Sequence, residues 1–456
     1  MDKLRRCLPP RIRRALDELP ETLDETYERT LLDIDDENWE FAHRLFQCIV
    51  IAQRPLHVEE LAGFLASKSE EGGSLTFEEN WQPEDPRDMV LSTCSSLIAV
   101  VNVDGPEVIQ FSHFSVKEYL TSYRIAKSRV SRYYIPLESA HLFVTQACLA
   151  LLIQLDEHAT RKSIEKFPLA RYAGQYWAKH AEFGDVSSHT EDLIKQLFDP
   201  KNYHFKNWVW IYDTISHQSM PFEFPSDLTL FPLHYAARHG FDRVAEWLIT
   251  ACSQDVNDTP YYRNTPIYNA CAYGHFKMVQ LLLNHHAVVH DSGMRGWTSL
   301  HAASSSRNPK PEITRLLLEH GADVNSEAAG SHTPLCLLTI QSGNLEVADV
   351  LLEHGADPNI RPRNGMGPLY WALWKGHLGL GRLLVKHGAD RNPAVGFDDT
   401  LLHTACRLGK LKAVQFLLEV GVDMNLQDDG GTTPLQLASV YEYEPIVQLL
   451  LEHGAQ

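Results

Sequence analysis

Cysteine is scarce in this sequence of 456 residues, which contains eight cysteines and no Cys-x-x-Cys pair. Most of the eight stand in apolar runs, where a free thiol is usually buried and unreactive. This usage excludes a disulfide framework and argues against a zinc site built on paired cysteines. We therefore expect an intracellular protein in the cytoplasm, with a nuclear location left open.

Long apolar segments are also lacking. The longest apolar run, 142–155, includes Thr145 and Gln146 and falls short of the roughly 20 residues that cross a bilayer. The first ten residues have no apolar core of the kind found in secretory signals. The sequence therefore predicts neither a membrane partner nor secretion.

Positive charge is in deficit, because 41 basic residues face 59 acidic ones and leave a formal net charge of −18. Such a chain repels phosphate backbones, so we expect no nucleic acid partner. The exception is a basic segment at 1–20, which we interpret as a solvated linker. The hydrophobic content of 44% is that of a globular protein, and the length suggests several domains.

Catalytic signatures are missing as well. The phosphate-binding pattern Gly-x-x-x-x-Gly-Lys-Ser/Thr occurs nowhere in the sequence. His113 stands in sequence near Cys94 and Glu118, but no glycine-rich nucleophile elbow accompanies them. We interpret His113 as a hydrogen-bonded residue at a hairpin-to-helix corner. The sequence thus predicts a protein that is not an enzyme, with no catalytic, cofactor-binding or metal-binding residues.

What the sequence does contain is a repeat. The phrase Leu-Leu-Leu-Glu-His-Gly-Ala-Asp-Val-Asn at 316–325 returns in near copies at 350–359, 383–392, 416–425 and 449–455. A second phrase, close to Thr-Pro-Leu-His, recurs every 33–35 residues. Its seven copies start at positions 231, 265, 298, 333, 367, 400 and 433. Two phrases in fixed phase indicate a stack of similar units.

Each phrase has a structural task. Proline suits the first turn of a helix, where its missing N–H costs nothing, and the preceding threonine can cap that helix. Leucine runs supply the shared core, and glycines stop the helices in a left-handed conformation. The inner-helix glycines are Gly240, Gly274, Gly343, Gly376 and Gly409, and the outer-helix glycines are Gly321, Gly355, Gly388, Gly421 and Gly454. The pattern resembles the ankyrin repeat and implies an α-solenoid of about seven repeats over 226–456.

Departures from the pattern locate irregularities. Repeat three carries two extra residues around 307–311, and repeat four has Leu338 in place of a small residue. Repeat seven has Tyr443 where we place the glycine of the inner helix. Because no polar capping repeat follows Gln456, we expect the last repeat to be the least stable.

Histidines in the two phrases invite a zinc hypothesis, since carboxylates are close to them in sequence. Their positions recur once per repeat, so they spread along the stack and do not converge on one ion. We interpret them as scaffold residues. These histidines are His234, His301, His320, His354, His387, His403 and His453.

Binding residues are expected where the copies disagree, on the finger tips and inner helices. Tyr, Trp and Arg concentrate binding energy at protein interfaces. We therefore predict a protein ligand on the concave face, with packing under the fingers as the alternative for each aromatic residue. The candidates are Tyr261, Tyr262, Arg263, Arg295, Trp297, Arg361, Arg363, Trp371, Trp374, Lys375, Phe397 and Arg407.

The first half of the chain has a different pattern. Helical periodicity is predicted from 21 to 34, from 37 to 52 and from 57 to 65. Strands at 97–101 and 108–111 and a closing helix at 114–122 follow. Three helices and a hairpin predict a winged-helix domain at 21–135, of mixed α+β structure. A helical connector is expected at 136–225, where the aromatic stripe of 168–181 is interpreted as core.

Four segments of this half resemble the winged-helix region that follows the NACHT nucleotide-binding domain in fungal NLR-like (STAND) proteins. They are 19–29, 54–62, 94–98 and 111–120, which include Leu-Pro-Glu-Thr-Leu-Asp-Glu-Thr-Tyr-Glu-Arg and Phe-Ser-His-Phe-Ser-Val-Lys-Glu-Tyr-Leu. The resemblance implies the C-terminal region of such a receptor, without its nucleotide-binding domain, and possible pairing with an upstream NACHT-type partner.

The hypothesis from the sequence is a non-enzymatic interaction and signalling protein whose repeats recognise a protein ligand. Two alternatives stay open. The chain is a fragment of a NACHT NTPase whose phosphate-binding domain lies elsewhere, or it is a winged-helix transcriptional regulator. The helix predicted at 57–65 carries Glu59 and Glu60 and no Lys or Arg, which disfavours DNA recognition.

Overall fold

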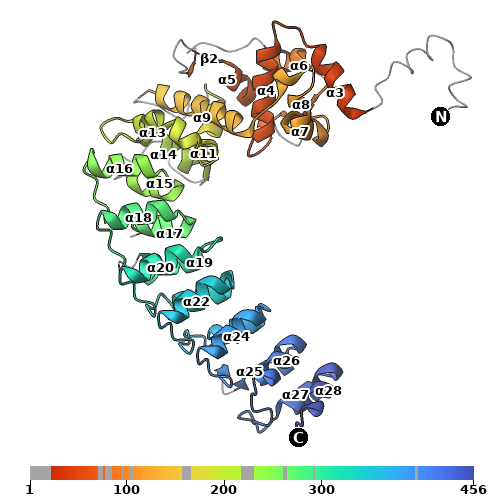
Figure 1. The fold of residues 1–456 in the computed structure, drawn as a ribbon, viewed down its shortest axis with the longest axis vertical. Helices are drawn as coiled ribbons and strands as arrows, with labels where there is room; N and C mark the ends of the chain where they lie inside the picture. The colour runs from red at the N-terminus through yellow and green to blue at the C-terminus, as the bar shows by residue number, and fades with distance from the viewer. Residues whose placement is uncertain are drawn as a thin grey trace, which may run out of the picture. The chain divides into compact units, whose positions relative to one another are not determined.

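The computed structural model shows a mainly helical chain, as predicted, in two compact units, Met1–Leu230 and Phe231–Gln456 (Figure 1). The described residues are 22–69, 75–77, 85–94, 96–102, 106–156, 166–216, 231–259, 264–290, 293–395 and 399–456. The predicted basic linker and the predicted repeat-domain start at 226 therefore lie outside the described residues. The other predicted domain boundaries stay predictions.

The first unit opens with the helices and the hairpin that periodicity predicts. Its elements are α3 (Leu23–Leu32), α4 (Trp39–Ile51), β1 (Leu56–His57), α5 (Val58–Leu65), β2 (Ser67–Ser69), β3 (Leu75–Phe77), α6 (Pro86–Cys94), β4 (Ile98–Val101), β5 (Val108–Phe111), α7 (Phe114–Thr121) and α8 (Tyr123–Ala126). The Thr22 hydroxyl caps α3 by accepting the Glu25 N–H. A short strand that the sequence did not reveal, β1, completes an antiparallel sheet of order β1-β5-β4.

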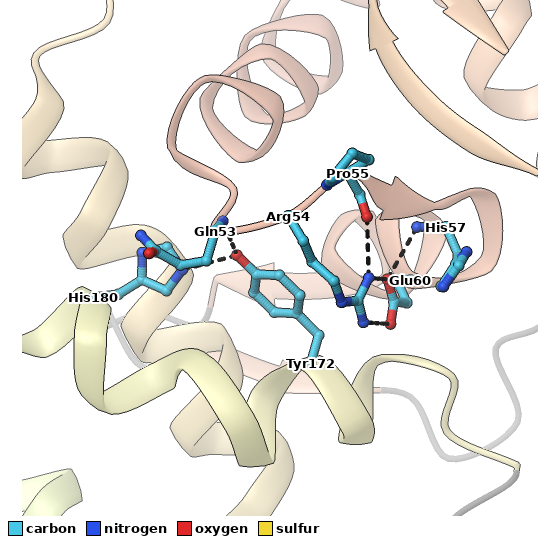
Figure 2. A network of polar contacts seen from close by, with 7 residues as sticks. All are labelled: Gln53, Arg54, Pro55, His57, Glu60, Tyr172 and His180. Atoms are coloured by element: carbon cyan, nitrogen blue, oxygen red, sulfur yellow. Dashed lines mark hydrogen bonds and ion pairs between the residues drawn. The ribbon is translucent and has the colours of Figure 1, made fainter. Parts of the chain in front are cut away.

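Helix α5 packs against α4, α6 and a later helix, α11 (Leu169–Ala181), and six of its eight residues are buried. One of them is Glu60, whose carboxylate receives two bonds from the Arg54 guanidinium, of 2.6 and 2.7 Å. It also accepts the His57 N–H at 2.9 Å (Figure 2). The guanidinium stacks over the rings of Tyr172 and Tyr176 from α11. A paired, fully bonded carboxylate of this kind tolerates burial.

A short polar chain continues from this ion pair into the core. The Tyr172 hydroxyl accepts the Gln53 N–H at 3.2 Å and lies 2.9 Å from His180 Nε2 (Figure 2). His180 Nδ1 in turn lies 2.9 Å from His141 Nδ1. Burial lowers the pKa of His180 to about 3, helped by the neighbouring His141, so both rings are neutral in the folded protein.

The rest of the first unit is helical. It comprises η1 (Ser131–Tyr133), α9 (Leu137–Gln154), α11, α12 (Val186–His189), α13 (Glu191–Phe198) and α14 (His204–Ser216). The stripe predicted as core in α11 is confirmed, because Leu169, Tyr172, Ala173, Trp177 and His180 are buried. Trp177 packs edge-on against Trp208 of α14, whose indole N–H donates to the carbonyl of Gly174 at 2.9 Å.

Within the described residues, α9 has the length and apolar composition that a membrane-crossing helix would also have, with a mean hydropathy of 1.3 over 18 residues. Half of that stretch is buried inside the structure, and α4, α11 and α13 pack against it. Its position in the core accounts for its apolar composition.

The second unit is a row of seven helix pairs, as the repeat predicts (Figure 1). The inner helices are α15 (Pro232–His239), α17 (Pro266–Tyr273), α19 (Ser299–Ser305), α21 (Pro334–Gln341), α23 (Pro368–Trp374), α25 (Leu401–Arg407) and α27 (Pro434–Val440). The outer helices are α16 (Asp242–Thr250), α18 (Phe276–Asn284), α20 (Pro311–Glu319), α22 (Leu345–Glu353), α24 (Leu378–Lys386), α26 (Leu411–Glu419) and α28 (Glu444–Glu452). Finger loops add the turn η2 (Met294–Gly296) and the strands β6 (Ala394–Val395) and β7 (Asp399–Thr400).

The predicted helix stops are confirmed by the backbone. All ten glycines assigned to them have positive φ, from +60° at Gly343 to +92° at Gly454. Three repeats place other residues in this left-handed conformation, namely Ser253, His286 and Glu442. The assignment of Tyr443 to the glycine position of repeat seven was wrong. Glu442, with φ +59°, occupies that position, because the chain makes its tight turn one residue earlier.

Candidate interaction surface

Histidines of the Thr-Pro-Leu-His phrase hold neighbouring repeats together. His301 Nδ1 accepts the backbone N–H of Thr298 at 3.1 Å, and its Nε2–H donates to the carbonyl of His332 in the next repeat at 3.0 Å. His403 repeats this arrangement with Thr400 and with the carbonyl of Thr432. Both nitrogens are engaged in cohesion of the stack, so these rings are not free to bind a ligand.

Histidines at the ends of the outer helices have a local task. Nδ1 of His320, His354 and His453 lies 2.8–2.9 Å from the carbonyl oxygen four residues earlier. In the part of the chain that the structure describes, no three His, Cys, Asp or Glu residues gather as they would around a metal ion. The buried thiols are unreactive too, since burial raises the pKa of Cys336 and of Cys406 to about 12.

Asparagines of the Asp-x-Asn ends link consecutive repeats. The Asn325 amide donates to the carbonyl of Gly355 at 3.0 Å, and its Oδ1 accepts the N–H of Asp357 at 2.8 Å. Asn359 makes the same two bonds one repeat later, to Gly388 and Asp390. Sequence reasoning assigned these residues only to turns, because nothing in one repeat shows which neighbour its asparagine reaches.

The predicted finger-tip residues are only partly described. Tyr261, Tyr262, Arg263 and Phe397 lie outside the described residues. Arg295 is exposed, and its carbonyl accepts the Ala329 N–H of the next finger at 2.7 Å. Trp297 is half-buried, with its ring 6.2 Å from that of His301.

The fingers of repeats four and five are joined in the same way. Arg363 is exposed, and its N–H donates to the carbonyl of Gly330 at 3.0 Å. The Arg361 guanidinium pairs with Asp390 of the next finger at 3.4 Å. Of the two predicted arginines here, Arg363 therefore has its charge available to a ligand, whereas Arg361 shares its charge with a neighbour.

The predicted inner-helix residues cluster at the boundary between repeats five and six. Trp374 stacks on Tyr370 with ring centroids 5.6 Å apart, and Trp371 meets the same tyrosine edge-on at 5.3 Å. Lys375, the next residue, is exposed. Arg407 of α25 pairs with Asp399 at 2.6 Å. Three of these four predicted residues thus share one patch on α23 and its end.

At this boundary no ring packs on the glycine that follows the inner helix of repeat five. At three other boundaries, the residue that opens an outer helix lies over the glycine of the preceding repeat. The pairs are His275 on Gly240, His377 on Gly343 and Tyr443 on Gly409. The equivalent residue in repeat six is Lys410, and nothing lies within 4 Å of a Cβ built on Gly376.

Lys410 instead places its ammonium over the ring of Trp374, 4.6 Å from the centroid. The backbones of α23 and α25 lie farther apart than those of other neighbouring inner helices. A small hollow, with room for about one water molecule, is left between them. It is lined by Tyr370, Leu373, Trp374, Leu401, Ala405 and Lys410. Tyr370 and Lys410 were missed as candidates. The available signal was Lys410 itself, at a position where repeats two, five and seven have His275, His377 and Tyr443.

A second small hollow, with room for about one water molecule, lies on the other side of Tyr370, under the finger of repeat five. Arg361, Leu369, Asp390 and Pro393 contribute to its walls. Among the described residues, repeats five and six therefore combine hollows, exposed cations and aromatic side chains, which is the composition that interface hot spots favour.

Models of known families identify the second unit. The model described as ankyrin repeats (3 copies) matches residues 233–328 and 389–456, and that described as ankyrin repeats (many copies) matches residues 336–385. The predicted ankyrin repeats are thereby confirmed. The predicted winged helix stays a prediction.

Relatives include the azaphilone pigments biosynthesis cluster protein L of Monascus ruber, 30% identical over 296 residues, which are 60% of this chain and 61% of the relative. The human transient receptor potential cation channel subfamily A member 1 is 28% identical over 49% of this chain and 21% of its own length. The chain thus spans less than two thirds of these relatives. The match to the Monascus protein covers 60% of this chain, which is more than the second unit contains. The similarity to that protein therefore extends into the first unit.

Solved structures that match are ankyrin repeat domains. That of human ASB11 is 25% identical, with a TM-score of 0.42, over 50% of this chain and 99% of that one. That of Bcl-3 is 26% identical, with a TM-score of 0.44, over 49% of this chain and 98% of that one.

Proposed function

We propose that this chain is a non-enzymatic interaction protein whose ankyrin repeats recognise a protein ligand through their inner helices and finger tips. The observation that carries the proposal is the stack of seven repeats with exposed Arg and Lys beside Trp and Tyr. Ankyrin repeats generally bind protein partners, and the side chains at this surface are those that concentrate binding energy.

The proposed context is that of an NLR-like signalling protein in the cytoplasm. Support comes from the resemblance of the first unit to NACHT-associated winged-helix regions and from a fungal relative whose similarity extends beyond the repeats. Helix α5 exposes only Glu59, whereas its apolar residues are buried against α4 and α11. A helix enclosed in this way is better placed to transmit a conformational change within the unit than to insert into a DNA groove.

The test uses the full chain as bait in extract of its source cells, with two double charge reversals at predicted residues. One is Arg263→Glu with Arg295→Glu, and the other is Arg363→Glu with Lys375→Glu. The matched control is Arg315→Glu with Lys386→Glu, since both lie exposed on outer helices. We expect at least one partner to be depleted by a predicted pair and kept by the control. Partners equally recovered by all three variants would contradict the proposal.

A further inference from the structure

Charge is distributed unevenly along the repeats. Residues 361–412 contain nine Lys or Arg and three Asp or Glu, a net charge of +6. Residues 311–360 contain one basic and eight acidic residues, and residues 413–456 contain seven acidic residues and no Lys or Arg. A basic band of about one and a half repeats therefore lies between two segments of net charge −7, in a chain of net charge −18.

Three of the nine cations are balanced locally, because Arg361, Arg382 and Arg407 pair with carboxylates. The other six are exposed and form no ion pair with a described residue. These six are Arg363, Lys375, Lys386, Arg391, Lys410 and Lys412. Their charge is offset by no described carboxylate, so it is available to a partner of opposite sign.

Two of the six, Lys375 and Lys410, stand beside the hollow between α23 and α25. Lys410 forms part of its wall, and Lys375 directly follows Trp374. The remaining wall is mostly apolar, with Leu373, Leu401 and Ala405. The hollow has room for about one water molecule, so it does not enclose a ligand side chain. The charge of the two lysines is therefore the main feature that a partner would meet here.

We propose that the junction of repeats five and six binds an acidic, extended segment of a partner protein through Lys375, Lys410 and the other unpaired cations of the basic band. The inference rests on the proposed function and names the chemistry of the partner. A cationic ligand is disfavoured, because the ammonium of Lys410 already covers the Trp374 ring. A long nucleic acid is disfavoured as well, since it would run from the basic band onto acidic repeats on both sides.

The direct test is fluorescence anisotropy with the full chain and three labelled probes. The first is a twelve-residue peptide of Glu and Asp. The second replaces the acids by Lys, and the third is a single-stranded 20-nucleotide DNA. We expect the acidic peptide to bind at least about tenfold more tightly than either of the others. Its affinity should fall as NaCl is raised from 50 to 300 mM, because exposed charges are screened.

One comparison locates the site. Lys375→Glu with Lys410→Glu should weaken the acidic peptide about tenfold. Lys277→Glu with Arg315→Glu, an equal change of charge at exposed outer-helix residues outside the basic band, should leave it nearly unchanged.

Equal weakening by both variants, or tighter binding of the DNA, would overturn the inference. The proposed function is tested separately, because it requires only that a charge reversal on some part of the repeats deplete a partner from the extract. Partners depleted by the Arg263 and Arg295 reversals alone would keep the proposed function and reject this site.

Discussion

Single residues in the repeats act mainly through bonds to the neighbouring repeat. The His301 ring links its own Thr298 cap to the carbonyl of His332, and it is fully buried. Burial lowers its pKa, so the neutral ring with Nδ1 as acceptor and Nε2–H as donor is the folded form. The histidine of this phrase therefore ties repeats together.

Replacing His301 by Ala should lower the free energy of unfolding of the repeats by about 2 kcal/mol, because a cap N–H and a buried carbonyl each lose a partner. Urea denaturation followed by circular dichroism measures the change. The control is His320→Ala, where an exposed ring bonds only within its own helix, and we expect a change within about 0.5 kcal/mol. Equal effects of the two changes would show that the link between repeats contributes nothing.

Glu442 adopts a left-handed conformation, with φ +59°, at a position where five other repeats place glycine. Glu442→Gly should relieve that strain and stabilise repeat seven by roughly 0.5–1 kcal/mol. Hydrogen exchange of the α27 and α28 amides should slow a few-fold. Glu444→Gly, in the helical first turn of α28, is the control and should speed the exchange instead. Slower exchange in both variants would contradict the assignment of strain to Glu442.

At the scale of elements, the contact of a ring with a glycine decides whether the turn after an inner helix has room for a side chain. Where His377 packs on Gly343, that turn has no room, whereas the turn at Gly376 is open. Lys410 extends over Trp374 and leaves Gly376 uncovered.

Two glycine substitutions separate this contact from backbone strain. Gly343→Ala and Gly376→Ala both place a Cβ at positive φ, +60° and +78°, but only the first Cβ would overlap a ring. We expect Gly376→Ala to cost about 1 kcal/mol and Gly343→Ala to cost about 1–3 kcal/mol more, as overpacking does. Urea midpoints of the two variants give the comparison. Equal losses would mean that the ring moves away freely.

At the scale of the whole molecule, the described part of the chain buries several neutral histidines, so both units should respond to acid. In the first unit, His180 faces the Tyr172 hydroxyl and His141, and Lys117 adds to the lowering of the pKa of His141 that burial causes. In the second, burial lowers the pKa of His234 to about 4. Folding therefore excludes protons that the unfolded chain binds.

Stability should accordingly be complete above the unfolded pKa of about 6.5 and fall as the pH drops toward the folded values. The sign follows because the unfolded state holds more protons in this range. Urea unfolding at pH 7.5 and pH 5.0 tests it, with a lower midpoint expected at pH 5.0. His180→Gln should flatten the pH dependence of the first unit and leave that of the repeats unchanged. An unaltered slope would assign the acid response to other groups.

The sequence by itself determined the repeats. Their period, the helix stops at the ten glycines, the proline starts and the buried stripe of α11 all follow from local rules that each segment obeys alone. The sequence also showed which residues lie at positions that the repeat pattern leaves variable, including Trp371, Trp374 and Lys375.

Only the tertiary structure decided how those residues combine. The reach of Asn325 and His301 into the next repeat, the pairing of Arg361 and Arg407 with carboxylates, and the opening between α23 and α25 depend on side chains from two repeats at once. The repeat period shows which residues each repeat contains. How closely two successive repeats pack depends on the shapes and charges of the side chains at the boundary between them. At the junction of repeats five and six, a lysine lies over a tryptophan, whereas three other boundaries bring a ring onto a glycine.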